Sequence, residues 1–267
     1  MIKADIHTHT AFSTDSDTPM EDMIEAAIGL GLDHLCITEH MDKDYPTAPD
    51  FFLDTDSYKK KFFEMKEKYA GRIGLLFGVE LGLLPHLAGW HEEYIKKYPF
   101  DFIIGSEHNP KNVDPYYPAF FEGRSEEAAY TEYFEETLVN LKAFSDFDAL
   151  GHMDYVVRYG PNKNKEYSYS KYSRYIDPIL EFIVNNGIAL EVNAGGYKKG
   201  LGEPNPCRDI IIRYKELGGE MITVASDAHS PEWLCYEFDR IEAMLVELGF
   251  KYYTVFENRR PIFYPLG

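Results

Sequence analysis

Short runs of apolar residues alternate with longer amphipathic segments along almost the whole chain. Most of these runs are continuous, which is typical of strands buried on both faces of a parallel sheet. They predict strands at residues 2–7, 34–39, 73–80, 101–105, 147–151, 188–193 and 220–226, with a possible late strand at 252–256.

The segments between the predicted strands carry signals for the start and end of helices. Thr18 is a candidate N-cap, with Pro19 at the first helical position and Glu21 as a capping-box glutamate. Gly187 and Gly249 mark helix ends, because glycine readily adopts the left-handed conformation there. The predicted helices cover residues 18 to about 29, 57–70, 125–144, 170–186, 206–217 and 231–248.

Seven or eight β-α units in 267 residues favour an α/β barrel over an open sheet. Residues 41–55, 109–124 and 155–169 are irregular and rich in Pro, Tyr, Asp and Asn. Each follows a predicted strand. Because barrel enzymes carry their chemistry at the carboxyl ends of the strands, we expect these three stretches to be loops over the site.

Composition excludes some classes of partner. With 45% hydrophobic residues the chain can bury a substantial core. The net charge of -18 argues against nonspecific binding of nucleic acid or of an anionic membrane, both of which need a basic surface. A small anionic substrate remains compatible, since a bound metal can invert the local field.

The expected location is the cytoplasm. The N-terminus is too polar and short for a signal peptide, and no apolar run approaches the ~20 residues of a transmembrane helix. Three cysteines without paired spacing indicate reduced thiols. The sequence does not determine an oligomeric state.

Metal-binding side chains recur at the ends of the predicted strands. Imidazoles and carboxylates are ligands of zinc, manganese and iron, and nine of them are too many for one tetrahedral ion. Two or three ions would suit the set, because a carboxylate can bridge two metals. The nine candidates are His7, His9, Asp15, His40, Glu80, His108, His152, Asp227 and His229. The other histidines, His34, His86 and His91, fit no such position.

These residues belong to a recognisable series of motifs. In chain order they are His7-Thr8-His9, Thr38-Glu39-His40, Gly78-Val79-Glu80, Glu107-His108, Gly151-His152 and Ser226-Asp227-Ala228-His229. The series resembles the PHP (polymerase and histidinol phosphatase) family, and most of all its stand-alone histidinol-phosphate phosphatases. The resemblance implies a single domain over residues 1–267, folded as a distorted TIM-like (β/α)7 barrel with a trinuclear centre of zinc, manganese or iron.

The resemblance also implies how the ligands are shared. His7, His9, Glu80 and Asp227 would hold the first metal. Glu80 would bridge to a second metal, completed by His108 and His152, and Asp15, His40 and His229 would hold the third. Asp15 stands where some family members have histidine, which makes an oxygen-preferring ion such as manganese or iron plausible beside zinc.

The implied activity is hydrolysis of L-histidinol phosphate to L-histidinol and phosphate, in histidine biosynthesis, by attack of a metal-bridging hydroxide. Asp227 or His229 would orient the nucleophile or relay a proton. Arg158 would clamp phosphate oxygens and assist catalysis, and Lys198 would bind phosphate where similar phosphatases tend to carry arginine. Candidate contacts to the rest of the substrate are Asp42, Tyr117, Asp154 and Glu191.

Three other functions are compatible with the pattern. A related enzyme would act on another small phosphoester, such as a nucleotide, a sugar phosphate or a phosphotyrosine. A catalytically silent PHP module is less compatible, since such modules usually lose ligands. A metal amidohydrolase also starts with His-x-His, but many need a lysine on the fourth strand, and residues 101–108 contain none.

Overall fold

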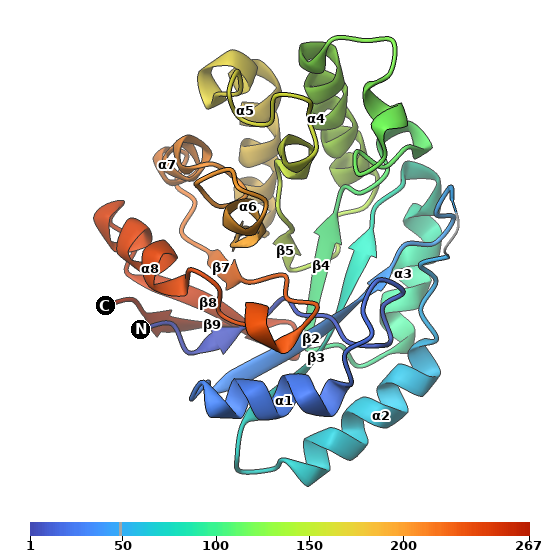
Figure 1. The fold of residues 1–267 in the computed structure, drawn as a ribbon, viewed down its shortest axis with the longest axis vertical. Helices are drawn as coiled ribbons and strands as arrows, with labels where there is room; N and C mark the ends of the chain where they lie inside the picture. The colour runs from blue at the N-terminus through green and yellow to red at the C-terminus, as the bar shows by residue number, and fades with distance from the viewer. Residues whose placement is uncertain (48–49) are drawn as a thin grey trace.

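A nearly closed barrel of parallel strands forms the centre of the computed structural model, which describes residues 1–47 and 50–267 (Figure 1). The strands lie in chain order in one sheet. They are β1 (Ala4–Asp5), β2 (His34–Met41), β3 (Gly74–Gly82), β4 (Phe102–Ser106), β5 (Ala149–Leu150), β6 (Ala189–Asn193) and β7 (Ile222–Ala225). All seven predicted strands are confirmed.

The first and last strands approach each other just beyond their carboxyl ends. A parallel bridge joins Thr8 to Ala228, and the His9 N–H donates to the Ala228 carbonyl over 2.9 Å. The Asp227 N–H donates in turn to the carbonyl of His7 over 3.0 Å. The backbone that closes the barrel is therefore the same backbone that carries three of the predicted metal ligands.

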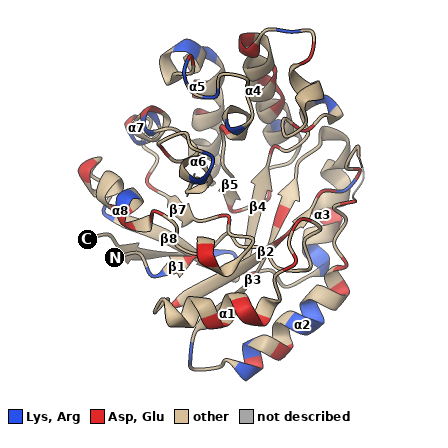
Figure 2. Ribbon diagram, in the orientation of Figure 1, with Lys and Arg blue, Asp and Glu red and all other residues tan. Residues whose placement is uncertain are grey.

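Helices surround the barrel (Figure 1). In Figure 2 most charged segments lie on these helices and on loops, while the strands are mostly uncharged. Within residues 1–47 and 50–267, no helix is both long and apolar enough to cross a membrane. The helices are α1 (Met20–Gly29), α2 (Thr55–Lys68), α3 (Ala88–Lys97), α4 (Glu126–Ala143), α5 (Tyr169–Asn186), α6 (Gly195–Lys198), α7 (Arg208–Glu216) and α8 (Phe238–Glu247).

Several helix predictions need correction. Thr18 does not cap α1, because its hydroxyl donates instead to the carbonyl of His229 over 2.8 Å, and the helix begins after Pro19. The helix predicted at 231–248 begins only at Phe238, since the residue before it adopts a left-handed conformation. Helices α3 and α6 were not predicted. The irregular stretch 41–55 lies partly outside the described residues.

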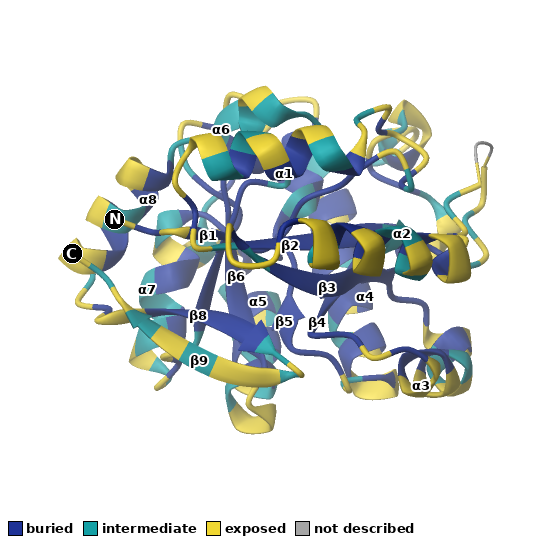
Figure 3. Ribbon diagram, turned by 90° about the horizontal axis from the view of Figure 1, so that it is seen from below, coloured by how far each residue is buried: buried dark blue, intermediate teal, exposed yellow. Residues whose placement is uncertain are grey.

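A hairpin covers the amino ends of the strands. The late strand β8 (Tyr252–Glu257) pairs with β9 (Arg260–Pro265) in a separate antiparallel sheet rather than joining the barrel. The hairpin turn is tied to residues that precede β4 and β5: the Asn258 N–H donates to Asp101 Oδ1 and Arg259 Nε to Asp148 Oδ1, over 3.0 and 3.1 Å. Figure 3 shows β9 as the exposed outer layer beside the buried β8.

Candidate metal centre

Glu80, near the end of β3, lies at the centre of the predicted ligand set. Strand register places it beside His40, because the two residues pair between β2 and β3. Glu80 Oε2 lies 2.9 Å from His40 Nδ1 and 3.1 Å from His7 Nε2. Glu80 Oε1 lies 3.1 Å from His108 Nε2 and 2.9 Å from His152 Nε2. One carboxylate thus contacts imidazoles delivered by four different strands.

Two aspartates extend this cluster toward the protein surface. Asp227 Oδ1 lies 3.6 Å from His9 Nε2 and 3.8 Å from His7 Nε2. Asp15 Oδ2 lies 3.1 Å from His229 Nε2 and 3.7 Å from the Nε2 atom of His40. The structure therefore brings all nine predicted ligand side chains into one continuous cluster.

Within this cluster, groups of three ligand atoms lie within 4.8 Å of one another. One group contains His7, His9 and Asp227, as expected for the first metal. Another contains His9, His40 and His229, which partly matches the set expected for the third metal. The remaining groups are His7 with Glu80 and His152, and His40 with Glu80 and His108, so Glu80 takes part in two of the four groups.

The chemistry of these donors fits divalent cations. Among the described residues, His7 Nε2, His9 Nε2, Glu80 Oε2 and His229 Nε2 are buried without a hydrogen-bond partner. Buried polar atoms are normally partnered, and several unpartnered ligand atoms aimed at one another need a compensating charge. A bound divalent cation would supply that charge, because all the donors are nitrogen or carboxylate oxygen.

The second ring nitrogen of several histidines is held by a neighbour. His7 Nδ1 lies 2.6 Å from Glu191 Oε1, His9 Nδ1 lies 3.1 Å from Ser13 Oγ, and His108 Nδ1 lies 2.7 Å from Asp42 Oδ1. Such contacts fix the ring orientation and leave Nε2 as the metal-binding atom. The sequence analysis missed this role for Ser13, Asp42 and Glu191.

Electrostatics favour the ionised form of the carboxylates. Burial alone would raise the pKa of Glu80, but the surrounding imidazoles, His7 foremost, hold that pKa well below its usual range. Burial would likewise raise the pKa of Asp227, but the charge of His7 and a hydrogen bond with His9 keep that pKa low. Burial lowers the pKa of His9, assisted by the neighbouring His40. Charged carboxylates and a neutral imidazole are the forms that bind metals.

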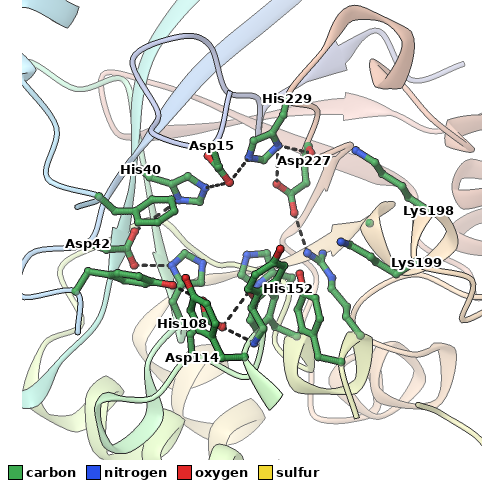
Figure 4. Close-up of a pocket in the computed structure, with 18 residues that line it drawn as sticks. Asp15, His40, Asp42, His108, Asp114, His152, Lys198, Lys199, Asp227 and His229 are labelled. Atoms are coloured by element: carbon green, nitrogen blue, oxygen red, sulfur yellow. Dashed lines mark hydrogen bonds and ion pairs between the residues drawn. The ribbon is translucent and has the colours of Figure 1, made fainter. Parts of the chain in front are cut away.

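A cavity of about 490 Å³ opens over the cluster (Figure 4). Its wall includes ligands, cations and aromatic rings from the loops after several strands. Besides six of the predicted ligands, it is lined by Asp42, Tyr45, Phe51, Asp114, Tyr116, Tyr117, Tyr155, Arg158, Tyr159, Gly195, Lys198 and Lys199. A small molecule in this cavity would therefore lie directly against the metal-binding groups.

Comparison with known proteins agrees with this geometry. Residues 5–195 match the PHP domain family. The chain belongs to the PHP family. It is 32% identical to a probable histidinol-phosphatase from Clostridium acetobutylicum over 96% of this chain and 97% of the relative. It is 28% identical to the histidinol-phosphatase of Lactococcus lactis, covering 97% of this chain and 96% of the relative.

Two solved structures share the fold. The crystal structure of histidinol phosphate phosphatase from Lactococcus lactis, complexed with zinc, L-histidinol and phosphate, superposes with a TM-score of 0.91 at 28% identity. It covers 97% of this chain and 98% of that one. A putative histidinol phosphatase from Listeria monocytogenes has a TM-score of 0.73 at 22% identity, over 89% of this chain and 99% of that one, which supports the barrel fold.

Arg158 lies in the cavity wall of this PHP barrel, with its guanidinium already engaged. Its Nη1 donates to Asp227 Oδ2 over 3.0 Å, and its Nε and Nη2 donate to the side-chain oxygens of Asn205 and Asn193, each over 2.8 Å. The side chain is buried. Arg158 is therefore held against the predicted metal ligand Asp227. A side chain that served only to clamp phosphate would instead be free of such contacts.

Two adjacent lysines, at the end of α6 and just after it, lie on the same side of the cavity. Lys198 Nζ lies 4.5 Å above the ring of Trp233, and Lys199 Nζ lies 5.2 Å from the ring centre of Tyr159. Burial is the main cause of a lowered pKa at both lysines. The sequence analysis predicted Lys198 and missed Lys199, although the two are adjacent in the sequence.

The predicted contacts to the non-phosphate end of a substrate divide into two pairs. Asp42 and Tyr117 line the cavity. Asp154 and Glu191 are fully enclosed and do not line it: Asp154 accepts from the Asn205 side chain and the Cys207 N–H, and Glu191 is bound to His7. Because their oxygens are used inside the protein, we revise these two assignments to supporting roles.

The three histidines that the sequence analysis set aside lie outside the cluster. His34 faces Glu257, and His86 pairs with Asp44 on the surface. His91 is buried in α3 and packs against Phe144. Sequence reasoning also missed three cavity-lining residues, Asp114, Tyr45 and Phe51. Their only signal was their place in irregular stretches after predicted strands.

Proposed function

We propose that this PHP-family chain is a metal-dependent phosphomonoesterase that hydrolyses L-histidinol phosphate to L-histidinol and phosphate. One observation carries the proposal: the nine-ligand cluster lies at the base of a cavity whose wall also holds an arginine and two lysines. The same wall holds Asp42, whose Oδ2 has no hydrogen-bond partner among the described residues. The Lactococcus lactis relative, with zinc, L-histidinol and phosphate bound, shares the fold over nearly the whole chain.

The metal number and identity are part of the proposal. We assign two to three divalent ions, zinc, manganese or iron, to His7, His9, Asp15, His40, Glu80, His108, His152, Asp227 and His229. When bound, such ions lower the pKa of a coordinated water and offset the negative charge of a phosphoryl group. The carboxylate of Asp15 beside His229 keeps manganese or iron compatible as well as zinc.

The chain's own residues position the reactants. Arg158 holds Asp227 through Oδ2, which leaves Oδ1 facing His7 and His9. We propose that Asp227 and His229 orient the nucleophile in this arrangement. Lys198, Lys199 and Arg158 supply positive charge on one side of the cavity, where a phosphate monoester dianion is attracted and held.

The proposed substrate is small, and the proposed location is the cytoplasm. The cavity accommodates a small phosphorylated molecule, while the net charge of -18 disfavours a nucleic-acid polymer. The free thiols of Cys36, Cys207 and Cys235 fit a reducing compartment.

The test is phosphate release from a panel of phosphomonoesters by purified chain loaded with manganese or zinc. We expect kcat/KM for histidinol phosphate to exceed that for nucleotides, sugar phosphates and phosphotyrosine by at least about 100-fold. Comparable rates on all of these esters would contradict the proposed substrate while leaving the phosphatase assignment intact.

A variant and a metal measurement test the mechanism. His152→Ala should lose activity while retaining its circular dichroism spectrum, since His152 contacts Glu80 at the centre of the cluster. Elemental analysis should find two to three metals per chain. Fewer than two in active protein, or full activity in His152→Ala, would contradict the shared metal centre.

A further inference from the structure

Two asparagine side chains hold the guanidinium of Arg158 from inside the protein. Asn205 Oδ1 accepts from Arg158 Nε and Asn193 Oδ1 accepts from Nη2, as described above. Both asparagines are fully buried and neither lines the cavity. Their backbones bond to each other in both directions, over 2.8 and 2.9 Å. The two amide oxygens therefore keep a fixed separation on the inner side of the guanidinium.

These acceptors orient Arg158 without cancelling its charge. Amide oxygens are neutral, so among the three acceptors of the guanidinium only Asp227 is an acid. Each terminal nitrogen of arginine carries two hydrogens, and one on Nη1 and one on Nη2 have no acceptor among the described residues. Because Arg158 lines the cavity, these N–H bonds remain for an anionic group there.

A buried carboxylate determines which end of the Asn205 amide faces Arg158. Asp154 Oδ1 accepts from Asn205 Nδ2 over 2.6 Å. Since a carboxylate can only accept and a guanidinium can only donate, one orientation of the amide satisfies both neighbours. Asp154 is itself fixed, because its Oδ2 accepts from the Cys207 N–H over 2.9 Å and from the Tyr167 hydroxyl over 3.1 Å.

The second asparagine is oriented by Glu191, which also serves the metal centre. Asn193 Nδ2 donates to Glu191 Oε2 over 2.9 Å, while Glu191 Oε1 contacts His7. Asp154 differs in this respect, because within the described residues its side chain bonds to no predicted metal ligand. A change at Asp154 therefore reaches Arg158 without directly altering a ligand.

We propose that Asp154 and Asn205 are positioning residues for Arg158. Asp154 turns the Asn205 amide so that its oxygen holds the guanidinium beside Asp227, where the free N–H bonds can meet a phosphoryl group. Neither residue touches the substrate. The catalytic consequence rests on the proposed function, since it assumes that Arg158 acts on a phosphate monoester.

Exchange of the two residues tests the chain of contacts. Asp154→Asn places a donor against a donor, because an amide has one oxygen where Asp154 uses two. Asn205→Asp places two carboxylates in contact. We expect each single variant to lower kcat for phosphomonoesters about 10- to 100-fold, as for a broken hydrogen bond to a charged group.

The double variant Asp154→Asn with Asn205→Asp restores a donor opposite an acceptor at every contact, with the polarity reversed. Its kcat should exceed that of either single variant at least about 10-fold, which is a coupling expected only between residues in contact. Losses that multiply in the double variant would overturn the proposal.

Dependence on Arg158 separates positioning from a purely structural role. In an Arg158→Ala background, Asp154→Asn should change kcat less than about 3-fold further, since it acts through the missing side chain. The same fold-loss in both backgrounds would show that Asp154 only stabilises the fold.

Asp148→Asn is the matched control. Asp148 is also a buried carboxylate that accepts from a backbone N–H and from an arginine Nε, but it lies at the amino ends of the strands. The change should lower stability and leave kcat within about 3-fold of the unmodified value. A loss of kcat as large as that of Asp154→Asn would remove the distinction between the two sites and overturn the proposal.

Exchange of the Arg158 Nε–H with water, followed by NMR, needs neither hydrolysis nor metal. In the unmodified chain it should be at least about 100-fold slower than at the exposed Arg174, because the Arg158 N–H is buried and bonded. The signal is the one missing from Arg158→Ala. Asp154→Asn should accelerate the exchange at least about 10-fold, and the double variant should reverse this change. Equal exchange at Arg158 and Arg174 in the unmodified chain contradicts the proposal whether or not any variant folds.

Failure of the proposed function gives a different result. An unmodified chain that releases phosphate from no monoester when loaded with manganese or zinc refutes that function, and slow exchange at Arg158 would not rescue it. An active chain in which the double variant fails to recover refutes only the role of Asp154 and Asn205.

Discussion

Glu80 concentrates negative charge where five imidazoles meet. Its two oxygens lie 2.9–3.6 Å from ring nitrogens of His7, His9, His40, His108 and His152. Because the carboxylate is fully buried, these contacts determine its ionisation. A single residue therefore links the separate groups of ligands, and neighbours that orient the imidazoles affect the whole centre.

Glu191 is such a neighbour, and Glu191→Gln should weaken metal binding. The change removes the negative charge that lies 2.6 Å from His7 Nδ1 while keeping the side-chain shape. We expect metal affinity to fall about 10- to 100-fold, measured by competition with a chelator. Glu181→Gln, at an exposed position of α5, is the control and should bind metal normally. Unchanged affinity in Glu191→Gln would contradict the supporting role.

Arg158→Lys should lower kcat more than it raises KM. Lysine cannot reproduce the three separate hydrogen bonds to Asp227, Asn193 and Asn205, so Asp227 loses its fixed position. We expect kcat to fall about 10- to 100-fold in steady-state assays. Lys199→Gln, which removes a cation held less tightly in the same cavity, should mainly raise KM. A pure KM effect in Arg158→Lys would instead indicate simple phosphate binding.

The convergence of the predicted metal ligands could be expected from the sequence, because all of them except Asp15 lie at or just after the end of a run of apolar residues that forms a buried strand. Strand order then brings those ends together without further information. Asp114 was not predictable in this way, since its position depends on contacts with Tyr45 and Tyr155 from other loops. The sequence analysis assigned Asp154 to substrate contact, but its carboxylate accepts a hydrogen bond from the Asn205 side chain inside the protein. This contact between distant segments also could not be predicted from the sequence.

At the scale of elements, the short helix α6 places Lys198 and Lys199 beside the cavity. The loop after it returns close to the start of the helix, where the Asn205 and Asn193 backbones bond to each other. The backbone is tightly packed here: a Cβ on Gly196 would lie 2.4 Å from the Glu203 carbonyl oxygen.

Gly196→Ala should therefore destabilise the protein. The nearest atoms belong to the backbone of Glu203 and Pro204, which cannot move aside as a flexible side chain would. We expect a loss of about 1–3 kcal/mol in the free energy of unfolding, measured by urea denaturation. Gly29→Ala is the matched control, because a Cβ there meets no atom within 4 Å. Equal stability of the two variants would contradict this packing argument.

The prediction of elements succeeded where buried strands or strong periodicity determined them and failed where a distant contact did. Thr18 has the sequence of a helix cap, yet its hydroxyl bonds to the carbonyl of His229, 211 residues away in the chain. Helix α3 was missed because it follows β3 without a recognisable cap. The hairpin β8–β9 has a strand pattern, but nothing local distinguishes it from an eighth barrel strand.

At the scale of the whole molecule, the cluster joins residues from both ends of the chain. His7 and His9 follow the first barrel strand, and Asp227 and His229 follow the last barrel strand, β7. Without cations, the buried carboxylates and imidazoles remain incompletely paired. Metal binding should therefore stabilise the closed barrel as well as supply chemistry.

Removal of the metals with a chelator should lower the melting temperature. A ligand present at 100 times its dissociation constant stabilises the folded state by about 2.7 kcal/mol, which corresponds to a shift of about 5–10 °C for a chain of this size. Differential scanning calorimetry before and after chelation measures the shift, and added manganese or zinc should reverse it. Glu80→Gln should respond much less, and an unchanged melting temperature would contradict the coupling.

The hairpin below the barrel also affects how the molecule behaves toward its own copies. Strand β9 is exposed, and a free strand edge is a template for further strands from other chains. Pro261 and Pro265 lie within this strand and have no N–H to offer. Two prolines in six residues thus interrupt the row of N–H donors that edge-to-edge pairing with a strand of another molecule would require, which disfavours this route to aggregation.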